Sequence, residues 1–166
     1  MSITTTRPSR RRRVATALFA AVATAGLLAG CGDKASESAP LTVTDQWVKA
    51  APSGMTAAFG TLTNKGSAPV HIVSASSPAA GRTEIHEVVP VNGAMQMRQK
   101  PGGLVIPAGG SLTLKPGGDH IMLFDLPAAI TAGQEVKVTL VLADKSTVEF
   151  TAQARDFPGA NEKYGH

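Results

Sequence analysis

Apolar and polar residues alternate along most of the chain after residue 40. The alternation is clear in LTVTDQWVK (41–49), EVKVTLVLA (135–143) and STVEFTAQA (146–154). A period of two residues is typical of a strand with one buried face, because successive side chains of a strand point to opposite sides. No stretch shows the 3.6-residue apolar stripe of a long helix. The pattern therefore predicts a domain built from strands.

Turn-forming residues divide the rest of this region into further short strands. Asn92-Gly93 is a strong signal for a two-residue hairpin, and Asp144-Lys145 separates two of the alternating segments. Further strands are predicted at residues 57–64, 71–76, 83–89, 94–98, 104–106, 111–114 and 120–126. About nine or ten short strands, with turns roughly every 8–12 residues, indicate an all-β fold over residues 41–156, an antiparallel β-sandwich or barrel.

The first 30 residues have a different character. Five arginines lie within the first 13 residues, and the 17 residues from Val14 to Gly30 carry no charge. A basic start followed by a short apolar core is typical of a signal peptide, whereas 17 residues are at the short limit for a membrane-spanning helix. We therefore interpret residues 1–30 as a signal peptide, with a permanent transmembrane anchor as the alternative.

The end of this leader resembles the lipobox of bacterial lipoproteins. Leu28-Ala29-Gly30 precedes Cys31, the one cysteine of the chain. The resemblance implies that the Cys31 thiol carries acyl chains such as palmitate, and that cleavage makes it the first residue. Because each buried methylene contributes ~0.8 kcal/mol, several chains hold a protein on the cell membrane, outside the cytoplasm or in the periplasm. Residues 31–40 then form a flexible tether, and residues 157–166 a flexible tail.

Charge and composition argue against several classes of function. The formal net charge is +4, but without the five leader arginines the chain has 11 basic and 12 acidic residues. This charge is nearly balanced, and only 4% of residues are aromatic. We therefore expect no binding of nucleic acid. The chain has no nucleophile elbow, phosphate loop or dinucleotide fingerprint, so we expect that it is not an enzyme.

Histidine and methionine are the side chains with the most informative placement. His120 and Met122 are two residues apart in one predicted strand and share a face, as do Met95 and Met97. His86 lies across the predicted hairpin from these two methionines. Imidazole and thioether form a soft ligand set that favours Cu(I) over hard cations. From spacing alone, a metal site and the use of methionine as core filler both stay open.

The spacing of these residues resembles the signature of the periplasmic copper chaperones of the PCuAC type. Ten residues separate His86 from Met97, and 22 separate Met97 from His120-Ile121-Met122. The segments SGMTAAFGTLTN (53–64) and IPAGGSLTLKPGGDHIML (106–123) are also similar to the family. The resemblance implies a cupredoxin-like β-sandwich that binds Cu(I) through four residues: His86, Met97, His120 and Met122.

Two departures from the family pattern concern this ligand set. The second spacer is one residue longer than usual, and Val88 stands where many members have an additional methionine. Met95 is a candidate substitute for that sulfur, and His166 is a further candidate whose role stays open. Since blue-copper electron transfer needs a cysteine ligand and Cys31 is assigned to the anchor, the resemblance implies a copper carrier and no redox centre.

The resemblance also implies partners. We expect delivery of copper, for cytochrome c oxidase assembly, to the copper-site domain of the oxidase or to a Sco-like protein. Delivery would occur by ligand exchange at an exposed, undercoordinated site. Two alternatives stay open: a metal-free structural or adhesive β-sandwich lipoprotein, and a copper storage or detoxification protein.

Overall fold

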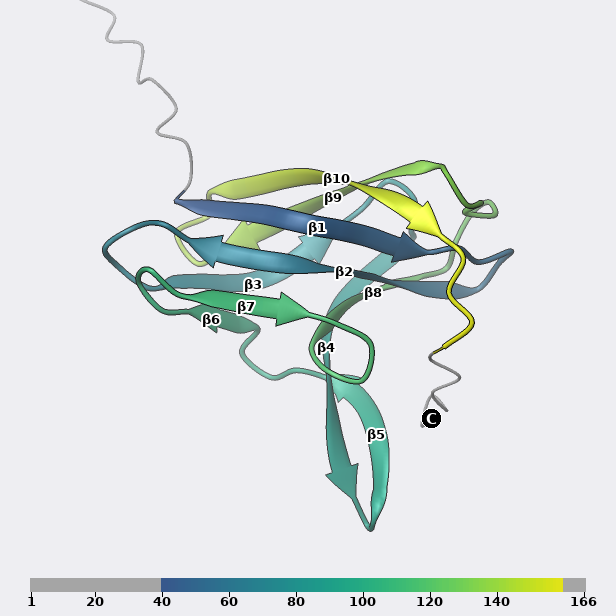
Figure 1. Cartoon of the computed structure of the whole chain (residues 1–166), viewed down its shortest axis with the longest axis horizontal. Coiled ribbons are helices and arrows are strands. Elements are labelled where there is room, and N and C mark those ends of the chain that lie inside the picture. Colours follow the sequence, from purple (N-terminus) through teal and green to yellow (C-terminus); the bar gives the residue numbers. More distant parts are fainter. Residues whose placement is uncertain (1–39, 160–166) are drawn as a thin grey trace, which may run out of the picture. The chain divides into compact units, whose positions relative to one another are not determined.

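The structure, a computed structural model, describes residues 40–159. The regular secondary structure in this range consists of strands alone (Figure 1). The strands are β1 (Leu41–Lys49), β2 (Met55–Asn64), β3 (Val70–Ser76), β4 (Arg82–Val91), β5 (Ala94–Gln99), β6 (Leu104–Ile106), β7 (Ser111–Leu114), β8 (His120–Phe124), β9 (Glu135–Leu142) and β10 (Thr147–Arg155). Each predicted strand is present, with bounds that differ from the prediction by two residues or fewer. The predicted all-β fold class is confirmed.

The predicted signal peptide (1–30), Cys31 and His166 lie outside the described residues. Between residues 40 and 159, no helix is long and apolar enough to cross a membrane. The division of the chain into leader, tether, domain and tail stays a prediction.

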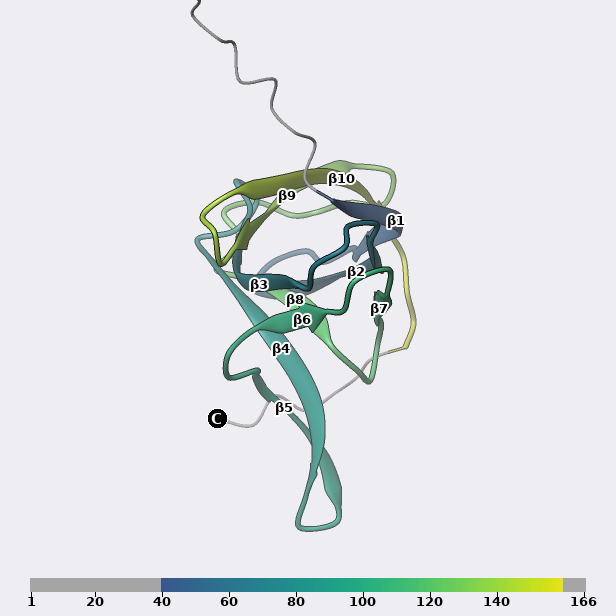
Figure 2. The same cartoon turned by 90° about the vertical axis from the view of Figure 1, so that its left-hand side faces the viewer.

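The ten strands form one sheet that curls over on itself. Its order is β5-β4-β8-β2-β1-β10-β9-β3-β6. Strand β7 also pairs with β2, along the second half of that strand, whereas β8 pairs with the first half. Figure 2 shows β9 and β10 on one side of the enclosed core and β2, β3 and β8 on the other. All neighbouring strands are antiparallel except β1 and β10, where Trp47 aligns with Gln153 in a parallel pair. This pair joins the two ends of the domain, a long-range contact that a local pattern of alternation does not reveal.

The main core fills the space between the two layers of the sheet. It includes Leu62, Ile72, Ile121 and Leu140, all of which are fully buried. Burial of one such side chain contributes about 1.5–3 kcal/mol. Neither Met97 nor Met122 belongs to this core cluster.

A β-bulge in β1 redirects one large side chain. Asp45 has a φ of 52°, and the pairing with β2 shifts register between Thr44 and Trp47. A bulge adds one residue to a strand and therefore changes which face the following side chains point to. Val48 reaches the main core, and Trp47 points to the opposite face of the sheet, where it contacts Phe59.

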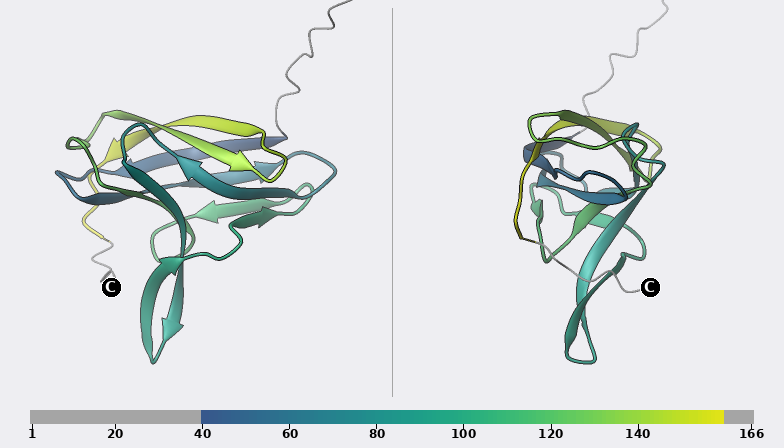
Figure 3. Two further views of the ribbon diagram at one scale, coloured as in Figure 1. Left: turned by 180° about the vertical axis from the view of Figure 1, so that it is seen from behind. Right: turned by 90° about the vertical axis from the view of Figure 1, so that its right-hand side faces the viewer.

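The β4–β5 hairpin extends away from the rest of the sheet, which Figures 1 and 3 show clearly. Its turn is Asn92-Gly93, as predicted, with φ values of 50° and 84°. Positive φ at both central residues is what a type I′ turn requires, and this turn matches the twist of the flanking strands. The hairpin holds β5 in register with β4, and Met97 lies opposite Val88.

The loop from β5 to β6 passes very close to β3. Gly103 has a φ of 74°, and a Cβ atom built there would lie 2.0 Å from the carbonyl oxygen of Ile72. The neighbouring Gly102 has a similar φ of 77° but nothing within 4 Å of its own Cβ position. Gly103 is therefore required both for its backbone conformation and for the close approach of two chain segments.

Candidate metal centre

Strand β8 is buried on both faces and serves two clusters. Ile121 and Leu123 point into the main core, whereas Met122 belongs to a separate cluster on the opposite face of the sheet. His120 alternates with Ile121 and therefore shares the face of Met122. His120 is 1% exposed and Met122 is 0% exposed.

Cross-strand pairing brings the other two predicted residues to this face. In the antiparallel pair of β4 and β8, His86 lies directly opposite His120, and their ring centroids are 5.7 Å apart. On β5, the sulfur of Met97 lies 3.1 Å from Nε2 of His120. Met97 also packs against the cluster that contains Met122. The structure thus brings together the four residues that the family resemblance implied.

Hydrogen bonds orient both imidazole rings. Nδ1 of His120 donates to the carbonyl oxygen of Gly118 at 2.8 Å, so Nε2 keeps its lone pair and faces the sulfur of Met97. On His86, Nε2 lies 2.7 Å from a carboxylate oxygen of Glu84. Nδ1 of His86 is buried and has no hydrogen-bond partner among the described residues.

Two of these donor atoms, Nε2 of His120 and the sulfur of Met97, lie close enough together to bind one metal ion. Bonds of about 2.0 Å to nitrogen and 2.3 Å to sulfur, the lengths found in zinc sites, allow one ion to bridge atoms up to about 4.3 Å apart. The 3.1 Å between Nε2 of His120 and the Met97 sulfur is within that reach. Within residues 40–159, no three His, Cys, Asp or Glu side chains are placed so that they could hold a metal ion. The sulfur-containing side chains of Met97 and Met122 lie on the same face of the sheet as the two histidines.

Aromatic side chains form the walls of this cluster. Met122 packs with Ala57 and Phe59, and Trp47 lies over Phe59 at a centroid distance of 4.5 Å. Trp47 also contacts Phe157 at 5.3 Å, so the first residue of the predicted tail covers this face as well. The cluster is less exposed than the sequence led us to expect, because these aromatic residues exclude water from it.

Sequence reasoning did not predict Glu84, whose carboxylate bonds to His86 beside this cluster. The Glu84-Ile85-His86 alternation was the available signal, since residues two apart on a strand share a face.

Charged side chains surround the cluster without entering it. The hydrogen bond from His86, the largest influence, and the nearby charge of Arg82 hold the pKa of Glu84 below its usual value. Past His86, the carboxylate of Glu87 forms ion pairs with Lys100 at 3.0 Å and Arg98 at 2.8 Å, which lower its pKa. These pairs join β4 to β5 and its following loop.

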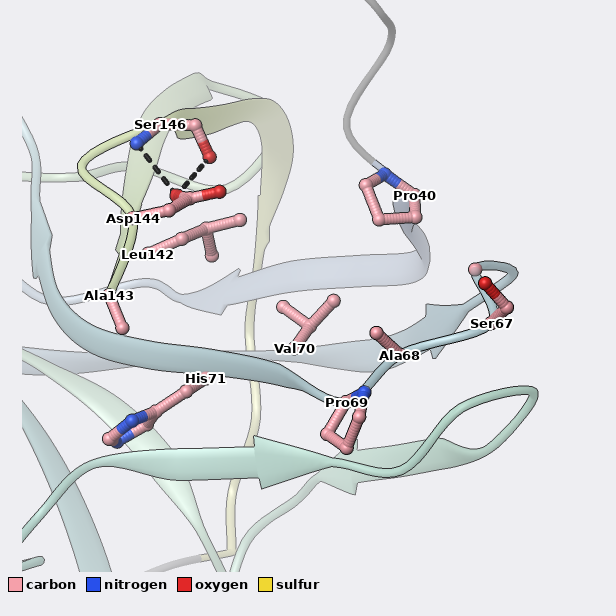
Figure 4. A pocket seen from close by; sticks show the side chains of 11 residues that line it. Pro40, Ser67, Ala68, Pro69, Val70, His71, Leu142, Ala143, Asp144 and Ser146 are labelled. Carbon is pink, nitrogen blue, oxygen red and sulfur yellow. Dashed lines mark hydrogen bonds between the residues drawn. The ribbon is translucent and has the colours of Figure 1, made fainter.

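The remaining candidates lie elsewhere. Met95, two residues before Met97, is 61% exposed and pairs with Pro90 nearer the hairpin turn. His71 is on β3 and lines a pocket beside the β9–β10 turn, where Ser146 donates two hydrogen bonds to Asp144 (Figure 4). This pocket contains none of the four clustered residues. His71 is therefore a suitable control position.

Solved structures define the class of protein to which this fold belongs. The apo PCuAC domain from PmoF1 matches with a TM-score of 0.58 at 21% identity, covering 70% of this chain and 94% of that domain. The Cu(I) form of DR1885 from Deinococcus radiodurans matches with a TM-score of 0.55 at 34% identity, covering 73% of this chain and 82% of that protein. The fold is that of the PCuAC domain, as the resemblance in sequence implied.

Sequence comparison then gives the family. The family described as "Putative lipoprotein LpqE-like" matches residues 41–154. The protein named "Putative lipoprotein Lxx21020" from Leifsonia xyli subsp. xyli is 50% identical over 122 residues, which are 74% of this chain and 74% of that protein. The chain belongs to the LpqE-like family.

Proposed function

We propose that this protein is an extracytoplasmic copper chaperone whose Cu(I) ligands are His86, Met97, His120 and Met122. The observation that carries the proposal is the approach of the Met97 sulfur to Nε2 of His120, at 3.1 Å. These are two soft donor atoms from separate strands, and neither belongs to the main core. The Cu(I) form of the similar protein DR1885 supports the choice of ion.

The chemistry of the donors supports Cu(I) in particular. Thioether sulfur prefers Cu(I) to hard cations, and it needs no deprotonation before it binds. The described residues include no cysteine, which a blue-copper electron-transfer site needs. A site of two histidines and two methionines therefore suits a carrier of copper better than a redox centre.

The position of Met97 suggests how copper leaves. His86, His120 and Met122 are buried, whereas Met97 is partly exposed and lies on β5, at one end of the sheet order. A ligand from a partner would reach the ion from the side of Met97 and displace this sulfur first. The proposed recipients are the copper-site domain of cytochrome c oxidase or a Sco-like protein.

Anaerobic titration of the full chain with Cu(I) tests the binding. We expect one equivalent to bind, and X-ray absorption to show both nitrogen and sulfur neighbours. No binding, or only nitrogen and oxygen neighbours, would favour the alternative of a metal-free structural or adhesive lipoprotein. Transfer of the bound copper to an apo oxidase copper domain would separate a chaperone from a storage or detoxification protein, which would retain it.

We also propose that Cys31 is lipidated and anchors the protein to the cell membrane. Membership of a lipoprotein family and the motif at 28–31 support this proposal. Cys31→Ser should release the protein from membranes or leave the leader uncut, because a hydroxyl cannot replace the acylated thiol. Membrane fractionation and mass spectrometry measure both outcomes. An unmodified thiol at residue 31 of the membrane-bound protein would contradict the proposal.

A further inference from the structure

Glu84 lies beside the metal cluster, at a position that the four proposed ligands do not explain. It lies two residues before His86 on β4 and directly opposite Met122 on β8. Its carboxylate oxygen is 2.7 Å from Nε2 of His86. An acidic side chain therefore shares a face with a buried cluster of soft, neutral donors.

We propose that Glu84 is a positioning residue that fixes the tautomer of His86, so that His86 binds copper through Nδ1 while His120 binds through Nε2. The inference rests on the proposed function and adds the identity of the two ligating nitrogens. It also gives Glu84 a role beside the metal without making it a ligand.

The hydrogen bonds assign the protons. An ionised carboxylate only accepts hydrogen bonds, so the nitrogen that bonds to Glu84 must be the one that carries hydrogen. In a neutral imidazole the other nitrogen then has the lone pair, and on His86 that is Nδ1. Nδ1 is buried without a partner among residues 40–159, although a buried polar atom is normally paired. A metal ion would supply the missing partner.

His120 has the opposite arrangement. Its Nδ1 donates to the carbonyl oxygen of Gly118, so its lone pair is on Nε2, beside the Met97 sulfur. The two rings are thus held by different acceptors, a side chain for His86 and a backbone carbonyl for His120. Each ring presents one lone pair before any metal arrives.

The carboxylate of Glu84 is itself held in place. Arg82, two residues earlier on the same face of β4, forms an ion pair and a hydrogen bond with Glu84. The guanidinium of Arg82 also lies 4.0 Å from the ring centroid of Phe124, its cross-strand partner on β8. This row of alternating residues orients the carboxylate toward His86. Partners of this kind fix the ring orientation of metal-binding histidines in many proteins.

Two leucine variants of the full chain test the role of Glu84. Glu84→Leu removes the acceptor and keeps a similar volume. Glu87→Leu is the matched control, because this acid lies one residue beyond His86, on the opposite face of β4, and pairs with Lys100 and Arg98. Nitrogen NMR of the histidine rings in the metal-free proteins reports the tautomers, and an anaerobic competition titration reports Cu(I) affinity.

We expect a single Nε2–H tautomer of His86 in the unchanged protein and in Glu87→Leu, and a mixture in Glu84→Leu. Cu(I) affinity should fall about 10–100-fold in Glu84→Leu alone, the usual effect of losing such a partner. Glu84→Gln, which keeps an acceptor oxygen, should restore most of both properties. Glu84→Ala, which also removes the acceptor, serves as the test variant if Glu84→Leu does not fold.

The proposal is overturned if the metal-free protein has hydrogen on Nδ1 of His86, or if Glu84→Leu changes neither the tautomer nor the affinity. A protein with the expected tautomer that binds no Cu(I) would contradict the proposed function, and with it the assignment of ligating nitrogens. The NMR result would still decide whether Glu84 fixes the ring. The two failures are therefore distinguishable.

Discussion

Met97→Leu is expected to weaken Cu(I) binding at least about tenfold, or ~1.4 kcal/mol, while the fold is retained. Leucine has nearly the volume of methionine but no sulfur lone pair, so packing survives and one metal bond is lost. An anaerobic competition titration with a chromogenic Cu(I) chelator measures the change, and circular dichroism checks the fold.

Met95→Leu provides the matched control for this variant. Met95 is on the same strand and the same face as Met97, but it is 61% exposed and belongs to no buried cluster. The same exchange at this position should leave the affinity nearly unchanged. Met122→Leu and His120→Ala should behave like Met97→Leu, and His71→Ala like Met95→Leu. Equal affinities in the Met95 and Met97 variants would exclude Met97 as a ligand.

Gly103→Ala is expected to lower the free energy of unfolding by roughly 3 kcal/mol or more. An alanine at positive φ costs about 1–2 kcal/mol, and at this position its Cβ atom would also collide with the backbone of β3. The backbone oxygen of Ile72, 2.0 Å from the Cβ position, cannot move without displacing β3 or the loop. Denaturant unfolding, followed by the fluorescence of Trp47, measures the loss.

Gly102→Ala separates the two contributions to this loss. Gly102 has almost the same φ, 77°, but an empty Cβ position, so its substitution should cost only the backbone term of about 1–2 kcal/mol. A similar loss in both variants would mean that the loop moves freely away from β3. A clear difference would show that the close approach is rigid.

The strands could be predicted because their signals are local. Alternation marked β1, β9 and β10, and the turn residues at Asn92-Gly93 marked the end of the hairpin. The pairing of β1 with β10 could not be predicted in this way, because these strands lie at opposite ends of the domain. The bulge at Asp45, which directs Trp47 to the metal cluster, has no clear signal in the alternation of residues 41–49.

The candidate site could be predicted only in part for the same reason. Period-two spacing placed His120 with Met122, and Met95 with Met97, but it did not choose between the two methionines of β5. That choice depends on how β5 pairs with β4 and on how β4 pairs with β8. Strand β8 begins only after 22 further residues beyond Met97. The burial of the cluster could not be predicted from the alternation either, because the aromatic residues that cover it come from β1, β2 and the segment after β10.

The place of β10 has a consequence for how the chain folds. The last strand lies between β1 and β9, and it is the link in the sheet order between β5-β4-β8-β2-β1 and β9-β3-β6. A chain that has not yet been completed therefore has two partial sheets with unpaired edges at β1 and β9, and such edges are prone to association. Contacts between the two ends of a chain also form slowly, because a long loop must close first. Nascent chains that stop before Thr147 should stay open, protease-sensitive and dependent on a holding chaperone.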